Sequence, residues 1–287
     1  MNSQRIAVIT DSGTDTSSEF CLEHDVRIMP LRIIYSDGST FESGIDITSE
    51  EVVRRFEREI PTTSLPSPQQ IRAILEGAKE GGYEKAVIVT ISSELSATNQ
   101  TVHMVADEMG DFPCIVIDTK SIGMMAGMVV MRAVEYVEAG VPFEELEARL
   151  VQDSLDTEIF FAVKSLDFLH KGGRIGGHIY RIGSVLNIKP VLTCDSEGRY
   201  VMAKKARGWD RALDTMVKLT VAAAAPFSRV RLCVCCSKAT SELFGMLEER
   251  LKDEVRAEIV EITRHGISPD LIVHTGPDLV GMGVQRA

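Results

Sequence analysis

Basic side chains are scarce in this sequence of 287 residues. Its 31 Lys and Arg residues are outnumbered by 42 Asp and Glu residues, which gives a formal net charge of −11. Binding to nucleic acid requires a basic face that neutralises phosphates, so this balance argues against nucleic acid as a partner. Long apolar runs are also missing, because IGMMAGMVVM and LTVAAAAPF fall well short of the ~18 apolar residues of a transmembrane helix. We therefore expect no stable insertion into a membrane.

Metal, redox and nucleotide motifs are missing as well. The cysteines form no C-x-x-C pair and the histidines form no H-x-x-x-H pair, so we expect buried reduced thiols, no metal site and no cofactor. The glycine-rich tract 169–178 matches neither the Walker A nor the dinucleotide-binding pattern, and we interpret it as a tight turn that presents Arg174. The apolar run before Thr10 is four residues long, too short for a secretory signal, which favours a cytoplasmic location.

Short β-branched runs alternate with amphipathic helical patterns in the first half of the sequence. Helices are predicted over 49–59 and 68–80, and over 121–151 with a break at 140–142. The predicted strands cover 5–11, 27–34, 85–92 and 114–119. Such alternation indicates parallel strands that are joined by helical crossovers.

The second half repeats this rhythm without an exact sequence repeat. Its predicted strands cover 158–163, 229–237, 257–263 and 271–275, and a hairpin turns at 195–198. The length suits two domains, and 44% hydrophobic with 25% charged residues is typical of a folded protein. We predict an N-terminal α/β domain over 1–155 and a C-terminal α/β domain over 156–287 with a hairpin insertion, both with mainly parallel sheets.

The stretch IPTTSLPSPQQI, residues 60–71, is rich in both hydroxyls and prolines. Proline fixes its own φ and restricts the preceding residue, so the hydroxyls are held on a stiff backbone. Ser67 is explained as the N-cap of the next helix, with Gln70 closing a capping box. Thr62, Thr63 and Ser64 have no such structural explanation.

Polar residues also follow the predicted strands, where ligands bind in open α/β sheets. Asp11 and Ser12 follow the first strand, and Ser92 and Ser93 follow the third. Together with Ser96 these last two serines precede a helix, whose free N–H groups favour an anion. Simple N-capping is the alternative explanation, and it needs one serine only.

Seven tracts occur in a fixed order and together resemble one family. They are AVITDSGTDTSSE, TTSLPSP, ISSELSATNQ, VIDTKSIGMMAG, SLDFLHKGGRI, LNIKPVL and HTGPD. This series resembles the DegV family, the fatty-acid-binding subunits of bacterial fatty acid kinase, over nearly the whole chain. Three positions depart from the family pattern: Ala97 and Asp278 stand where glycine is usual, and Leu65 stands where glutamine is common.

The resemblance implies two α/β domains with a long-chain fatty acid in the cleft between them. A separate ATP-dependent kinase subunit of the dihydroxyacetone kinase type then phosphorylates the carboxylate, so this chain is a carrier without catalytic activity of its own. The implied carboxylate-binding residues are Thr62, Thr63, Ser64, Ser93 and His274. His274 is expected at the end of the strand 271–275, as a hydrogen-bond donor. Arg174 and Arg207 are the implied contacts with the kinase.

Two alternatives remain open at this point. Ser93 and His274 could act as nucleophile and base of a small-molecule hydrolase, which requires the two side chains to be hydrogen-bonded. The chain could also carry lipid without any kinase partner. If the chain is a lipid carrier, with or without a kinase partner, its methionine-rich helix is a candidate tunnel wall, although ordinary core is the commoner role of such a helix. The methionines concerned are Met124, Met125, Met128 and Met131.

Overall fold

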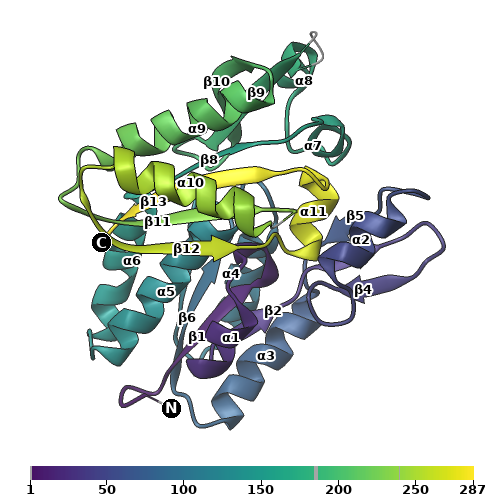
Figure 1. Ribbon diagram of the computed structural model, residues 1–287. Coiled ribbons are helices and arrows are strands. Elements are labelled where there is room, and N and C mark those ends of the chain that lie inside the picture. The colour runs from purple at the N-terminus through teal and green to yellow at the C-terminus, as the bar shows by residue number, and fades with distance from the viewer. Residues whose placement is uncertain (1, 184–186, 239) are drawn as a thin grey trace.

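The first half of the chain builds a four-stranded parallel sheet. A computed structural model describes residues 2–183, 187–238 and 240–287. The strand order is β2-β1-β6-β7, with β2 (Arg27–Met29), β1 (Ile6–Asp11), β6 (Lys85–Thr90) and β7 (Cys114–Asp118). Every neighbouring pair is parallel, which confirms the predicted crossover arrangement (Figure 1).

Both faces of this sheet are buried, because side chains alternate along each strand. Ile6 and Val8 of β1 pack on one face with α5 (Met124–Glu138) and α6 (Phe143–Leu155). Ala7 and Ile9 pack on the other face with α3 (Pro68–Glu80) and α4 (Thr98–Glu108). The remaining elements of this unit are η1 (Ser12–Thr14), α1 (Ser18–Glu23) and α2 (Ser49–Arg55).

The predicted helix boundaries have a clear local basis. The capping box at Ser67 is present in full, with the Ser67 and Gln70 side chains each accepting from the other's backbone N–H. Thr48 caps α2 by accepting from the N–H of Glu51. The break between α5 and α6 falls at Gly140, whose φ of 77° lies in the left-handed region that favours glycine.

The second half builds a six-stranded mixed sheet, which corrects the prediction of parallel pairing there. The order is β10-β9-β8-β13-β11-β12. The strands are β8 (Thr157–Ala162), β9 (Ile188–Cys194), β10 (Tyr200–Arg207), β11 (Arg229–Cys236), β12 (Glu258–His265) and β13 (Val280–Arg286). Among the strands described, β11 and β12 pair in parallel and the other neighbours are antiparallel. Antiparallel pairing follows from the predicted β9–β10 hairpin and from β13, which inserts between β8 and β11.

Two layers cover this second sheet. The helices α9 (Trp209–Ala224) and α10 (Ser241–Glu254) pack on one face. The other face packs against α5, so this helix is shared by both sheets. Gly283 of β13 permits that contact, since a Cβ at this position would lie 2.0 Å from Met125 Sδ. The first residue of the tract LNIKPVL lies outside the described residues, and the rest of it lies at the start of β9.

A small antiparallel sheet divides the predicted strand 27–34. Its order is β4-β3-β5, with β4 (Thr40–Glu42), β3 (Arg32–Ile34) and β5 (Thr62–Ser64). Pro30 has no backbone N–H, so the run breaks there and β2 and β3 join different sheets. The hydroxyl stretch is therefore a short strand, in which Thr63 lies opposite Ile33.

Residues 271–275 form a helix, which corrects the predicted strand. The helix α11 (Pro269–Thr275) begins with Pro269 in its first turn and follows Ser268. It packs against α2, α7 (Asp167–Lys171), β3, β5 and η1, so the consecutive residues Leu271, Ile272 and Val273 are all buried and resemble a buried strand in the sequence. It lies between the second sheet and the small sheet (Figure 1), and it carries His274 there.

Candidate functional site

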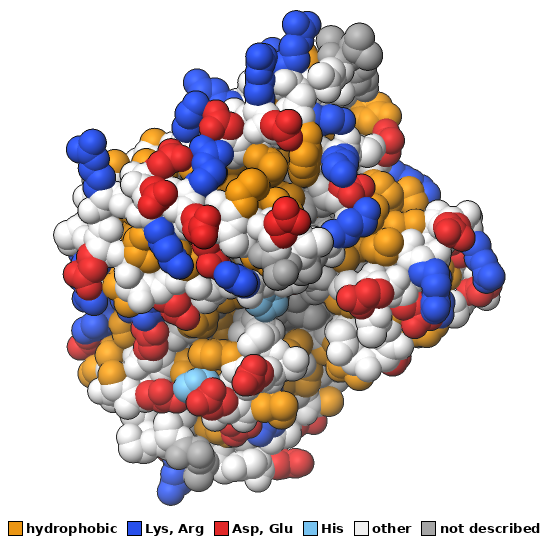
Figure 2. Space-filling model, viewed as in Figure 1, with side chains coloured by type: hydrophobic (Ala, Val, Ile, Leu, Met, Phe, Trp, Pro, Cys, Tyr) orange, Lys and Arg blue, Asp and Glu red, His pale blue; other side chains and the backbone are white. Residues whose placement is uncertain are grey.

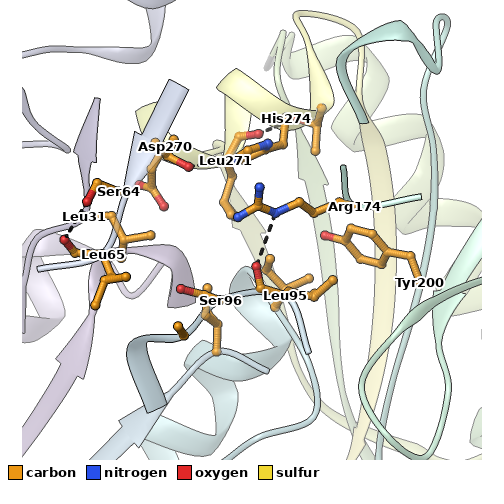
Figure 3. A pocket seen from close by; sticks show the side chains of 15 residues that line it. Leu31, Ser64, Leu65, Leu95, Ser96, Arg174, Tyr200, Asp270, Leu271 and His274 are labelled. Atoms are coloured by element: carbon orange, nitrogen blue, oxygen red, sulfur yellow. Dashed lines mark hydrogen bonds between the residues drawn. The ribbon is translucent and has the colours of Figure 1, made fainter. Parts of the chain in front are cut away.

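A cavity of about 290 Å³ lies where the small sheet, α11 and the second sheet meet. Hydroxyl and charged side chains border it from several directions (Figure 3). Thr63 and Ser64 come from β5, Ser96 from the segment before α4, Arg174 from the glycine-rich turn, and His274 from α11. Leucine and isoleucine side chains form much of the remaining wall, so the cavity is polar in one part and apolar in the other.

A second, narrower cavity of about 30 Å³ continues the apolar part. It shares Ile122, Tyr200, Leu271 and Thr275 with the first cavity. The rest of its lining is mainly apolar and also includes Asp15 and Gly123; the apolar residues are Met124, Ile159, Phe161, Cys235, Ile267 and Leu279. Tyr200 lies at the junction and meets Phe161 edge to face, with ring centroids 5.0 Å apart. Of the methionine-rich helix, Met124 lines this cavity whereas Met125 and Met128 are buried in the surrounding core.

Thr63 and His274 are brought together by β5 and α11. The Oγ1 atom of Thr63 lies 2.7 Å from Nε2 of His274. Burial and the nearby Arg174 charge lower the pKa of His274 to about 3, so the ring is neutral at physiological pH. Its Nδ1 atom has no partner among the described residues and packs against Gly172, where a Cβ would come within 2.2 Å.

Arg174 borders the cavity with a positive charge that no carboxylate neutralises within the described part of the chain. Its Nε donates to the carbonyl of Leu95 at 3.2 Å, and Nη1 donates to that of Gly172 at 2.6 Å. Burial lowers the pKa of this guanidinium. A partly buried cation held only by backbone dipoles is well prepared to receive an anion from the cavity.

The other sequence-predicted residues fall in different places. Thr62 is exposed and donates to the carbonyl of Ile34 at 3.4 Å. Ser93 is not among the residues that line the cavity, and its N–H donates to Asp118. Since His274 bonds Thr63, the Ser93–His274 pair that a hydrolase needs is not formed. Arg207, by contrast, is exposed at the end of β10.

Ser96 is the hydroxyl of the serine-rich tract that reaches the cavity. The helix α4 starts at Thr98 without a side-chain cap, so the serines precede it by at least one residue. Ser96 contacts Thr98 Oγ1 at 2.8 Å, whereas the Ser92 hydroxyl donates to the carbonyl of Gly198 in the β9–β10 turn at 3.0 Å. The position directly before a helix was the available sequence signal for Ser96.

Three buried carboxyl groups lie at or near the cavity, and the sequence analysis noted only Asp11 among them, for its position after the first strand. Asp11 accepts from the N–H groups of Gly13 and Ile91, both at 2.9 Å, and burial raises its pKa to about 7. Asp15 accepts from the N–H of Ser268 at 2.9 Å, and burial raises its pKa to about 8. The third is Asp270 of α11, which lines the cavity itself.

Asp278, one of the three departures from the family pattern, is turned away from this site. It pairs with Lys238 at 2.9 Å and with Lys164 at 3.6 Å. It is not among the residues that line either cavity. The substituted charge is therefore neutralised at the surface.

The fold combines a parallel and a mixed sheet around an internal cavity that is polar in one part and apolar in the other. The family model described as "Uncharacterised protein, DegV family" matches residues 5–287. A DegV domain-containing protein of Clostridium acetobutylicum is 34% identical over 283 residues, which cover 97% of this chain and 98% of that protein. The chain belongs to the DegV family.

Two solved structures are similar over almost their full lengths. One, of Thermus thermophilus, is named for fatty acid binding of a DegV family protein, with 30% identity, a TM-score of 0.90 and full coverage of both chains. The other is a stearic acid-binding protein of Eubacterium ventriosum, with 26% identity, a TM-score of 0.88 and 98% coverage of each chain. No helix in the described residues is long and apolar enough to span a bilayer.

Proposed function

We propose that this protein binds a long-chain fatty acid, with the carboxylate beside Arg174 and the acyl chain in the apolar part of the site. The observation that carries the proposal is the uncompensated Arg174 charge at one end of a cavity that is apolar at the other. Burial of ~15 methylenes at ~0.8 kcal/mol each contributes ~12 kcal/mol before ordering costs are subtracted. The fatty-acid-binding neighbours in the family support the same ligand class.

The proposed carboxylate site keeps three residues of the sequence-based set and adds two. Thr63, Ser64 and His274 remain, and Ser96 and Arg174 join them because they line the same cavity. A buried carboxylate needs several charge-assisted hydrogen bonds to offset its desolvation. When His274 Nε2–H donates to Thr63 Oγ1, the Thr63 hydroxyl hydrogen is free for the ligand. His274 thus serves the carboxylate through Thr63.

The chain further acts as a carrier that presents this carboxylate to a separate ATP-dependent kinase subunit in the cytoplasm. The family resemblance supports the partner, and the surface offers a place for it. Lys204, Lys205 and Arg207 are exposed on β10 in a chain of net charge −11. Figure 2 shows further Lys and Arg side chains at the end of the molecule where β10 and α8 (Gly177–Gly183) lie in Figure 1. The alternative function is that the protein carries lipid without a kinase partner.

Organic extraction of the purified protein followed by mass spectrometry tests the ligand class. We expect a fatty acid at a near-equal molar ratio. Among variants, Ser96→Ala should weaken palmitate binding roughly 10-fold or more, because one hydrogen bond to a buried anion is worth ~1.5–3 kcal/mol. Ser93→Ala is the matched control and should bind as wild type does. Loss of affinity in Ser93→Ala alone would place the carboxylate elsewhere.

A phosphorylation assay distinguishes a carrier that serves a kinase from a carrier that has no kinase partner. The purified, lipid-loaded protein is incubated with ATP alone and then with ATP and a kinase subunit of the dihydroxyacetone kinase type. Formation of acyl phosphate only in the second mixture is the expected result. If no such kinase forms acyl phosphate from the loaded protein, the carrier works without that partner.

A further inference from the structure

Asp270 is a buried acid inside the site where an anion is proposed to bind. It lies four residues before His274 on α11, so both side chains leave the same face of the helix. Only 1% of Asp270 is exposed. Its carboxyl group borders the same space as Ser64 and Arg174 (Figure 3). Two ionised carboxyl groups, one from Asp270 and one from the ligand, would repel each other in this cavity, so the protonation state of Asp270 matters for binding.

The hydrogen bonds around Asp270 distinguish its two oxygens. Oδ1 accepts from the Ser43 hydroxyl, and from the Ser12 hydroxyl at 3.3 Å. Both serine oxygens already accept backbone N–H groups, from Asp270 at 3.1 Å and from Leu31 at 3.0 Å. Their hydroxyl hydrogens are therefore available for Oδ1, which acts as an acceptor.

The second oxygen of Asp270, Oδ2, receives neither of these hydroxyl groups. It is buried and has no hydrogen-bond partner among the described residues. If Asp270 is neutral, the acid proton belongs on Oδ2, because Oδ1 receives both hydroxyls. An O–H group in that position needs an acceptor, and a carboxylate offers acceptors only.

Burial favours the neutral form of Asp270 by raising its pKa. A charge on Asp270 also raises the pKa of Asp11 and Asp15, so simultaneous ionisation of these neighbouring acids is unfavourable. His274 on the same helix is neutral, and Arg174 bonds backbone carbonyls. Charged groups on the packed elements α2, β3 and α7 have partners of their own: Glu51 with Arg55, Arg32 with Ser64, Asp167 with Tyr180, and Lys171 with the Ile60 carbonyl.

We propose that Asp270 binds the ligand carboxylate as a neutral acid, donating from Oδ2 to one of its oxygens. This inference rests on the proposed fatty-acid function and assigns a further residue to that site. The proton stays on Asp270, so two carboxyl groups share one negative charge beside the positive charge of Arg174. Ionisation of Asp270 would place two negative charges in the cavity and expel the ligand.

Palmitate affinity between pH 6 and pH 9.5 tests the assignment, since the free ligand is ionised throughout this range. Wild-type affinity should fall with rising pH, approaching about tenfold per pH unit once Asp270 has lost its proton in the free protein. Asp270→Asn keeps a neutral donor on the same frame. It should bind within about threefold of wild type at pH 6 and lose the alkaline fall. Asp270→Ala lacks the donor and should bind roughly tenfold more weakly at pH 6.

Two control variants isolate the effect. Asp278→Asn removes one negative charge from the surface pair with Lys238 and should keep the wild-type profile. Asp15→Asn tests the neighbouring acid, and if it removes the alkaline fall while Asp270→Asn retains it, the assignment to Asp270 is overturned. Circular dichroism of each variant confirms that it is folded.

The outcomes separate this inference from the proposed function. Wild-type protein that binds no palmitate at any pH overturns the proposed function and the role of Asp270 with it. Wild-type protein that binds palmitate, with the same alkaline fall in Asp270→Asn or with no fall by pH 9.5, overturns the role of Asp270 alone.

Discussion

Replacement of Thr63 by valine should separate the two roles that the structure gives to its hydroxyl. Valine keeps the shape of the side chain and removes the group that bonds His274 Nε2 at 2.7 Å. Since His274 Nδ1 already lacks a partner, neither ring nitrogen would then be hydrogen-bonded to a described residue. An unsatisfied buried polar group costs about 1–3 kcal/mol, and we expect the free energy of unfolding of the ligand-free protein to fall by that amount.

The same substitution should weaken fatty acid binding separately. A hydrogen bond to a charged group contributes about 1.5–3 kcal/mol, so the dissociation constant for palmitate should rise roughly 10- to 150-fold. Urea unfolding of the ligand-free protein measures the first effect, and titration with palmitate measures the second. Thr63→Ser retains the hydroxyl and should recover most of both.

Thr62 provides the matched control for this experiment. It is the neighbouring residue of β5 but is exposed, and its hydroxyl makes a long 3.4 Å bond to the carbonyl of Ile34. Adjacent residues of a strand point to opposite faces, so Thr62→Val alters the same strand without touching the cavity. Equal losses of affinity in Thr62→Val and Thr63→Val would refute the assignment of Thr63 to the carboxylate.

Two further predictions concern the kinase contact and the packing between the sheets. Arg207→Ala should lower phosphoryl transfer by an added kinase subunit and leave palmitate affinity unchanged, because Arg207 is exposed and absent from the cavity lining; equal loss of both would move it into the site. Gly283→Ala should lower the free energy of unfolding by about 1–3 kcal/mol, because its Cβ would lie 2.0 Å from Met125 Sδ and 2.9 Å from the carbonyl oxygen of Glu158. Gly245→Ala in α10, where nothing lies within 4 Å of the added Cβ, is the control, and comparable destabilisation there would contradict the packing argument.

Local patterns predicted the first sheet and its helices well. The runs at β1, β6 and β7 are β-branched and bounded by turns, and Ser67 marks the start of α3 through its capping box. Strand β13 was missed because Gly281 and Gly283 weaken the strand signal. Those glycines are explained by contacts with Cys235 and Met125, which are remote in sequence. Periodicity carries no information about such contacts.

The sequence indicated which segments carry hydroxyl groups for a site, but it did not indicate which residues of those segments line the cavity. The hydroxyl stretch drew attention to Thr63 and Ser64, and both residues line the cavity. The choice among Ser92, Ser93 and Ser96 depends on how the backbone turns before α4, which no spacing rule specifies. Asp270 was not assigned to the site from the sequence, because its burial results from the packing of α11 with elements that are remote in sequence.

The central position of β13 also determines the order in which the two units can fold during synthesis. All strands of the first sheet lie within residues 6–118, so that sheet can close early. In the second sheet, β8 pairs with β13 across more than a hundred residues, and β11 needs the same strand on its other side. Such distant pairing is slow, and until β13 arrives both strands expose an edge that can pair with other chains. The nascent second unit is therefore the part of this protein that depends most on protection from aggregation.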